Sequence, residues 1–519
     1  MSRTRCAGWI FAAHALCGAM LLTPAYIRPD SIATYSYLRS MVFDGDLSFF
    51  NEWSMFGMVR NGVTFFSEVT PIGALANHWW IGTSILAGPF YVLSLRFDGS
   101  DGFGLLLAWT SVFFVAAALS IACIFMRSHR TLAIAATTLG TPLFWYTFRF
   151  PLGTHAAGTL CVALIFAGLF LGKDSGALVG LAAGLAIATR LQHFVLLPAI
   201  VIVAIAQRRR LGWWISAICA GALPIAAQGI AWFAIYGTPL GPLTRGANLQ
   251  GVTWMPFQHI ALAEVLFSSY HGLLAWSPVV AVAMIGWVAG WRRDRQLALA
   301  CILMFAGEWL ANGTFDRYFW GGLSFGGRRF VDLAVPFALG IAWFAERLRT
   351  WIAIAVITPL VAWSVALMVA AHANTISLAR YVSGADLFAV VFNVDTWRRA
   401  ASTPLHAAHN WPVLLMIAAL TALFIALRRF AVVLAVAYSA VFVVVVAVCA
   451  TRTPKAAAES RVALRIDVKK SSRMGPLLDE RRLLADEVDW ARARGDAARV
   501  RATSNEIAAI DRLLSEINR

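Results

Sequence analysis

One carboxylate is set apart by its position in the sequence. Asp30 comes four residues after a long apolar segment, 6–26, and the nearest cation in the sequence is Arg28. The apolar residues that follow have the spacing of an amphipathic helix lying on a membrane surface, and they are Tyr35, Tyr37, Leu38, Met41 and Val42. Such a helix would hold Asp30 at the interface, partly removed from water, where a carboxylate is suited to general-base chemistry.

A second candidate is a cation that interrupts an apolar stretch. Arg190 lies in LAIATRLQHF, at the expected outer end of a pair of helices. An arginine in such a place is costly unless it meets an anion or extends its guanidinium to the interface. Arg190 is therefore a candidate anion ligand, and a structural interfacial arginine is the alternative.

Further basic residues stand where apolar segments begin or end. His271 and the pair Arg328 and Arg329 precede two apolar segments, and glycines at 321, 322, 326 and 327 adjoin the pair. These glycines fit either close approach of a ligand or a tight turn. The other candidate anion ligands are Arg149 and His78. His155, which follows Pro151-Leu152-Gly153-Thr154, would bind phosphate or acceptor, or act as a structural hydrogen-bond donor.

The amino-acid composition indicates the class of protein to which these residues belong. Of the 519 residues, 60% are hydrophobic and 13% charged, with a mean hydropathy of +0.70, whereas soluble domains are about a quarter charged. The net charge of +16 lies in short basic clusters between apolar runs, which indicates a membrane protein that follows the positive-inside rule and argues against nucleic-acid binding. The seven cysteines lie in apolar segments without C-x-x-C spacing, so no zinc site or disulfide framework is predicted.

The hydropathy predicts an all-α polytopic bundle of about 13 transmembrane helices. The first apolar run is long enough to span the membrane and lacks a small-x-small cleavage site, so it is expected to be a retained helix. The expected spans are 6–26, 103–126, 131–147, 155–172, 176–189, 193–206, 213–236, 271–291, 296–312, 330–345, 350–371, 411–427 and 430–450.

Orientation follows from the short basic loops. With Arg3 and Arg5 inside, every basic loop also falls inside, provided that Trp79–Leu95 is re-entrant or interfacial. The N-terminus is then cytoplasmic and the C-terminus lies outside. The long segments left outside are 27–102, 148–154, 237–270, 313–329, 372–410 and the tail from Thr451.

The chain divides at Thr451, where the composition changes from apolar to polar. We expect a transmembrane domain over 1–450, with 27–102 as its first external loop, and an external tail over 451–519. In the tail, apolar residues recur at helical spacing on both sides of Gly495, which predicts a linker followed by a short helical hairpin.

The order of several motifs resembles the GT-C glycosyltransferases, a superfamily that includes lipid A aminoarabinose transferases and protein O-mannosyltransferases. The resemblance extends from Arg28 to about Phe337, and bacterial members without an assigned substrate are the most similar. It rests on RPDSIATYSYLRSMVFDGDLSFFNEW, VTPIGALANHWWIGTSILAGPFYVL, FSSYHGLLAWSPV and FWGGLSFGGRRF. Where many relatives have a lysine, this chain has His78.

The resemblance implies a glycosyltransferase of the bacterial inner membrane. Its donor would be a polyprenyl-phosphate sugar, its acceptor a periplasmic or lipid-linked glycan, a lipid or a protein, and its stereochemistry inverting. Asp30 would be the general base, and the cations named above would hold the donor phosphate. Acceptor-side or loop roles are assigned to Tyr35, Arg39, Asp46, Glu52 and His155.

No cofactor is required by this scheme, because fixed cations would neutralise the phosphate. Asp44-Gly45-Asp46 forms a D-x-D pattern, which in soluble glycosyltransferases holds a metal and a nucleotide, and which here also fits a solvated turn. Two other functions are compatible with a polytopic chain. One is a transporter or flippase of lipid-linked saccharides, although no repeat symmetry is evident. The other is a catalytically inactive GT-C scaffold.

Overall fold

The computed structural model describes most of the chain as helices. The described residues are 3–22, 29–55, 70–98, 107–149, 153–245, 257–402, 431–453 and 477–518, without 71, 73, 108, 173–174, 258–259, 316–317, 323, 479–480 and 483. The expected span 411–427, Arg28 and the first part of the tail lie outside these residues.

Five described helices are long and apolar enough to cross a membrane, and they are α9 (Thr154–Leu171), α12 (Leu211–Tyr236), α16 (Arg295–Thr314), α18 (Thr350–His372) and α22 (Ala431–Arg452). Shorter apolar helices accompany them, namely α1 (Arg3–Leu21), α6 (Thr110–Phe125), α10 (Gly176–Thr189), α11 (Leu197–Ala206), α15 (Val279–Trp291) and α17 (Ala334–Ala345). The chain is thus an all-helical multi-pass membrane protein in the part that the structure describes.

Several expected spans are divided in the structure. The span 131–147 becomes α7 (Arg130–Gly140) and α8 (Leu143–Phe148), because the residue before Pro142 takes an extended conformation. Similarly, α15 begins only after Pro278 and is preceded by the short α14 (Leu273–Trp276). The spans 193–206 and 330–345 begin with 3₁₀ turns, η3 (Leu191–Leu196) and η5 (Arg328–Leu333).

Glycines allow the closest helix contacts in the bundle. A Cβ atom at Gly180 of α10 would overlap the backbone of Ala217 in α12, and one at Gly286 of α15 would overlap Gly340 of α17. The hydrophobic effect does not drive helices together in a membrane, because lipid tails are as apolar as the side chains. Close contact between backbones is therefore a main source of packing energy there. The sequence therefore places α10 against α12 and α15 against α17.

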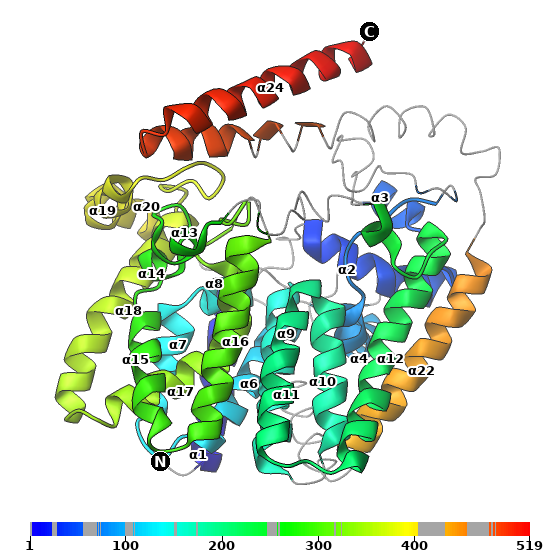
Figure 1. Ribbon diagram of the computed structural model, residues 1–519, viewed down its shortest axis with the longest axis horizontal. Helices are drawn as coiled ribbons and strands as arrows, with labels where there is room; N and C mark the ends of the chain where they lie inside the picture. The colour runs from blue at the N-terminus through cyan, green and yellow to red at the C-terminus, as the bar shows by residue number, and fades with distance from the viewer. Residues whose placement is uncertain are drawn as a thin grey trace.

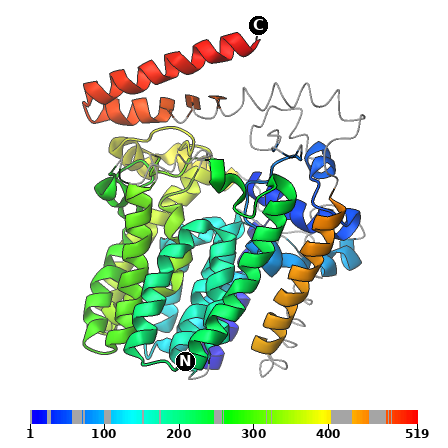
Figure 2. The same cartoon turned by 45° about the vertical axis from the view of Figure 1, so that its right-hand side comes forward.

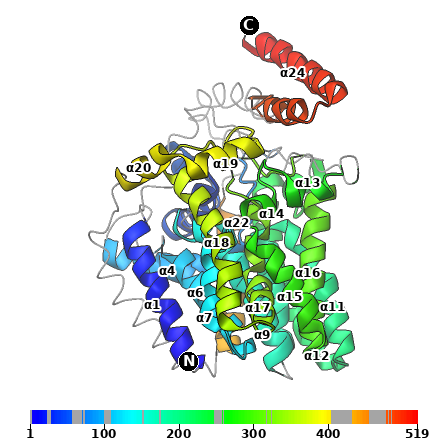
Figure 3. The same ribbon diagram turned by 90° about the vertical axis from the view of Figure 1, so that its left-hand side faces the viewer.

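The long helices run side by side, and the two ends of the chain lie at opposite ends of the bundle (Figure 1). The helix α24 (Ala497–Asn518) lies across the end away from the N-terminus, with a second helical segment within 477–493 beneath it and Gly495 at the turn (Figure 2). Near this end are also α13 (Leu262–Phe267), α19 (Gly384–Phe392) and α20 (Val394–Ser402) (Figure 3).

The first loop folds into the bundle rather than onto its surface. It forms α2 (Pro29–Arg39), a π-helical turn η1 (Ser40–Asp44), α3 (Phe50–Met55) and α4 (Gly82–Asp98). The predicted helix after Asp30 is α2, and its polar residues Ser31, Thr34 and Ser36 are buried together with its apolar ones, so neither of its faces is open to water. Segment 74–84 and α4 cover the side that was expected to face water.

Candidate active site

Asp30 lies in the first turn of α2 and is held by an indole. Its Oδ1 accepts a hydrogen bond from Trp79 Nε1 at 2.8 Å, and the residue is half-buried. Its backbone oxygen accepts from Thr34 Oγ1 at 3.0 Å, as expected inside a helix. The Trp79 indole thus fixes one carboxylate oxygen of Asp30. Because the indole is neutral, this contact does not neutralise the negative charge of the carboxylate.

The segment around Trp79 is fastened to α2 by buried hydrogen bonds. Asn77 Nδ2 donates to the oxygen of Ala33 at 3.1 Å, and Ser84 Oγ donates to the oxygen of Thr34 at 2.9 Å. Tyr37 Oη donates to the oxygen of Trp79 at 3.1 Å. These bonds join residues more than forty positions apart, so they orient the indole toward Asp30 through tertiary structure. Trp79 was not among the predicted site residues.

His78 is turned toward another helix. It is 3% exposed, and its Nδ1 lies 3.4 Å from the hydroxyl of Tyr236 at the end of α12. Nearby, Gln228 of the same helix accepts a hydrogen bond from the backbone N–H of Ile81 at 2.7 Å. The structure therefore places His78 where this segment meets α12.

The same segment also reaches the end of α10. A Cβ at Gly82 would overlap the backbone of Ala188 and Thr189, which immediately precede Arg190. The chain that holds Trp79 against Asp30 thus packs directly on the chain that presents Arg190. Two candidate groups that are 160 positions apart in the sequence therefore belong to neighbouring segments.

Arg190 faces a buried carboxylate of the chain itself. Its NH1 donates to Asp332 Oδ2 at 3.0 Å, and the same oxygen accepts from His193 Nε2 at 2.8 Å. His155 Nδ1 accepts a hydrogen bond from Arg190 NH1 at 2.8 Å and lies 3.8 Å from the second oxygen of Asp332. Asp332 thus supplies the anion that the position of Arg190 requires. Arg190 is therefore neither an unpaired interfacial arginine nor a guanidinium whose charge is left entirely for a ligand.

A second set of bonds joins this cluster to the arginine pair. Arg190 NH2 donates to Gln192 Oε1 at 2.7 Å, and Gln192 Nε2 donates both to Glu308 Oε2 at 2.9 Å and to the backbone oxygen of Arg329 at 3.2 Å. The side chain of Glu308 is completely buried. The network therefore connects residues of α9, α16 and η5 with Arg190 at the end of α10.

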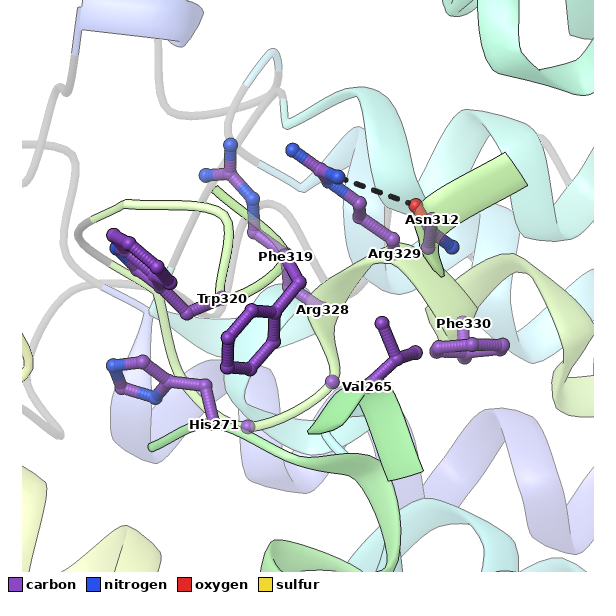
Figure 4. A pocket seen from close by; sticks show the side chains of 10 residues that line it. Val265, His271, Asn312, Phe319, Trp320, Arg328, Arg329 and Phe330 are labelled. Atoms are coloured by element: carbon purple, nitrogen blue, oxygen red, sulfur yellow. Dashed lines mark hydrogen bonds between the residues drawn. The ribbon is translucent and has the colours of Figure 1, made fainter. Parts of the chain in front are cut away.

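Arg328 and Arg329 border a small pocket that is partly open to solvent. Figure 4 shows the two guanidinium groups extending to the same side, with Arg329 bonded to Asn312 at 3.4 Å. The pocket is lined by Val265, His271, Asn312, Phe319, Trp320, Gly326, Gly327, Arg328, Arg329 and Phe330.

Besides the two ring nitrogens of His271, three N–H groups of lining residues lack a hydrogen-bond partner within the described residues, and they are Arg328 Nε, Asn312 Nδ2 and Trp320 Nε1. All three are donors, and unsatisfied buried donors are costly. The ligand that fits such a set is an acceptor of hydrogen bonds, and beside two guanidinium groups it is an anion.

Of the other predicted ligands, His271 lines this pocket, whereas Arg149 is not among its lining residues. His271 is 3% exposed and lies between Tyr270 and Trp276, each with ring centroids 4.9 Å from its own. The Arg149 guanidinium lies over Trp145, 6.0 Å from the ring centroid, and Trp145 stacks on Phe325. Arg149 is thus linked through Trp145 to Phe325, which precedes the arginine pair in the glycine turn. In that turn Gly321, Gly322 and Gly326 have positive φ angles, which the turn itself requires.

The loop residues brace the fold. Arg39 pairs with Glu52 at 2.8 Å and Asp44 at 3.2 Å, and burial raises the pKa of Glu52 to about 7 although Arg39 opposes that rise. Asp46 Oδ1 accepts hydrogen bonds from Ser40 Oγ and the Ser48 N–H. Both aspartates of the D-x-D pattern are therefore used within the turn.

Tyr35 is fully buried. Its ring packs edge-on against Tyr91, with the ring centroids 5.6 Å apart. The structure thus places it in the core between α2 and α4.

Sequence reasoning missed the acidic side of the site. Asp332 and Glu308 lie inside expected spans, 330–345 and 296–312, and both are fully buried. An ionisable residue inside a predicted membrane span is a signal of a functional or paired group, and it would have marked both. Their partners, His193 and Gln192, follow Arg190 directly in the sequence.

The comparisons with known proteins return little. No protein-family model matches the chain, and no curated protein matches it. One similar solved structure is the crystal structure of ArnT from Cupriavidus metallidurans in the apo state, with 15% sequence identity and a TM-score of 0.44. The match covers 86% of this chain and 78% of that one.

Proposed function

We propose that this chain is a membrane glycosyltransferase that transfers a sugar from a polyprenyl-phosphate donor to an acceptor on the outer face of the bacterial inner membrane. The observation that carries the proposal is a pocket with two arginines and three unpartnered N–H donors near the same end of the bundle as a carboxylate held by Trp79. The order of the GT-C-like motifs from Arg28 to Phe337 supports the same function.

In the proposed reaction Asp30 takes the proton of the acceptor hydroxyl as its oxygen attacks the anomeric carbon. The bond between that carbon and the phosphate oxygen breaks, and the phosphate leaves with the bonding electrons. Arg328, Arg329 and the free donors would stabilise the charge that develops on it. Inversion at the anomeric carbon follows from a single displacement. Fixed cations supply the charge neutralisation, so the scheme includes no metal ion.

The direct test is to incubate the purified protein with radiolabelled polyprenyl-phosphate sugars and to measure donor binding. Arg328→Ala and Arg329→Ala should each weaken binding by about 10- to 150-fold, because a charge-assisted hydrogen bond contributes about 1.5–3 kcal/mol. Arg398→Ala is the matched control, since that guanidinium is 78% exposed on α20. Unchanged affinity in both pocket variants would place the phosphate site elsewhere, with Arg149 and His271 to be tested next.

The proposed orientation has the N-terminus in the cytoplasm and the tail in the periplasm. A thiol introduced by Ser504→Cys, on the exposed face of α24, should react with a membrane-impermeant reagent in intact spheroplasts. The physical reason is the positive-inside rule applied to the basic loops. Reaction only after permeabilisation would mean that the tail faces the cytoplasm and that the expected topology is wrong by one crossing.

A further inference from the structure

The helical segment before Gly495 contacts residues next to the lining of the arginine pocket. Arg494 NH1 pairs with Glu264 at 2.6 Å, and Glu264 precedes the pocket residue Val265. The ring of Trp490 packs edge-on against Phe319, which itself lines the pocket, with centroids 5.7 Å apart.

A third contact between the tail and the bundle lies one helical turn before Trp490. Asp486 lies against Tyr270, the neighbour of His271, and the Tyr270 hydroxyl partly offsets the burial that raises the pKa of this carboxyl to about 6. Three residues on one side of the tail helix, at 486, 490 and 494, therefore touch three separate segments around one pocket. Their spacing of four is the helical repeat, so a single face of the tail segment contacts residues in and beside the pocket lining.

The hairpin is braced internally as well as against the bundle. Arg499 pairs with the buried Glu487 at 2.8 Å, and Arg481 pairs with Asp511 at 2.6 Å. Arg494 and Arg499 both lie over the ring of Trp490, at 5.0 and 4.6 Å. The contacts of Arg499 and Arg481 join the two helices of the hairpin, so it is braced by bonds of its own.

One contact to the bundle is an ion pair near the surface, whereas Trp490 and Ala491 are buried with the residues of the bundle core. The Arg494 side chain is 53% exposed and that of Glu264 15% exposed, and salt weakens an ion pair that water can reach. We propose that the C-terminal hairpin is a lid over the arginine pocket, that the Arg494–Glu264 ion pair is its latch, and that opening the latch admits the anionic ligand. The identity of that ligand as a donor phosphate rests on the proposed function, whereas the lid does not.

Access to the pocket can be measured without any assumption about activity. Val265→Cys places a thiol in the lining, and its reaction rate with an anionic methanethiosulfonate is followed by mass spectrometry, with the parent chain as background. Adding Arg494→Glu should raise that rate at least about threefold, because the reversed charge repels Glu264. Adding Glu264→Arg to this variant restores the pair with its charges exchanged, and it should return the rate to the starting value.

Arg492→Glu is the matched control, because this variant makes the same charge change in the same helical segment. The partner of Arg492 is Asp489, which belongs to the tail and not to the bundle. The control variant should leave the labelling rate unchanged. An unchanged rate in the Arg494→Glu variant, or a raised rate that the exchanged pair does not reverse, would overturn the lid. If labelling responds as expected while no polyprenyl-phosphate sugar binds to any variant, the lid stands and the proposed function fails.

Discussion

Replacing Asp30 with asparagine is expected to slow sugar transfer by about 10²–10⁴-fold while the protein stays folded and binds its donor. The loss is the usual contribution of a general base, which an amide cannot provide. Asparagine keeps an oxygen that can accept the hydrogen bond from Trp79 Nε1, so the local structure should persist. Donor affinity should change little, because the cations of the pocket and the prenyl chain supply it.

Turnover and donor affinity measured side by side separate the possible roles of Asp30. Asp44→Asn is the control, since it changes another aspartate of the same loop, one that pairs with Arg39, and it should leave turnover near that of the parent. Near-normal turnover of Asp30→Asn would remove the base from the mechanism. Loss of the folded state would instead make Asp30 a structural partner of Trp79.

The Asp332→Ala variant is expected to lose about 3–5 kcal/mol of unfolding free energy, the cost of removing one partner from a buried ion pair. Its Oδ2 accepts from both Arg190 and His193, and the carboxylate side chain is 1% exposed. Without it, Arg190 would keep its charge in a buried site with only neutral acceptors, His155 and Gln192. Unfolding in detergent, followed by loss of helical signal, measures the difference.

Asp395→Ala provides the matched comparison for this prediction. Asp395 pairs with Arg398 one helical turn away, but both side chains are at least 70% exposed, so the change should be within about 1 kcal/mol. An Asp332→Ala protein as stable as the parent would show that Arg190 finds another anion or reaches water. Reduced donor affinity in a stable Asp332→Asn protein would show that Asp332 also positions Arg190 for the ligand.

Much of the architecture follows from the sequence, because membrane insertion depends on a local property. Expected spans 155–172, 213–236 and 350–371 differ from α9, α12 and α18 by at most two residues at either end. A run of about 20 apolar residues must satisfy its backbone within one helix when it enters lipid, whatever the rest of the chain does. The same local reasoning pointed to Arg190, since a cation beside apolar helices needs an anion.

Only the tertiary structure determined which anion pairs with Arg190 and which residue holds Asp30. Asp332 is 142 positions from Arg190, and Trp79 is 49 positions from Asp30, so no periodicity in the sequence records either contact. The apolar spacing predicted the helix α2, but it did not predict that segment 74–84 covers this helix through hydrogen bonds to its backbone. The tail was predicted as a hairpin from its helical repeat, but its position beside the arginine pocket depends on contacts with Glu264, Phe319 and Tyr270. Pairings of this kind depend on how the helices pack, which a one-dimensional pattern does not contain.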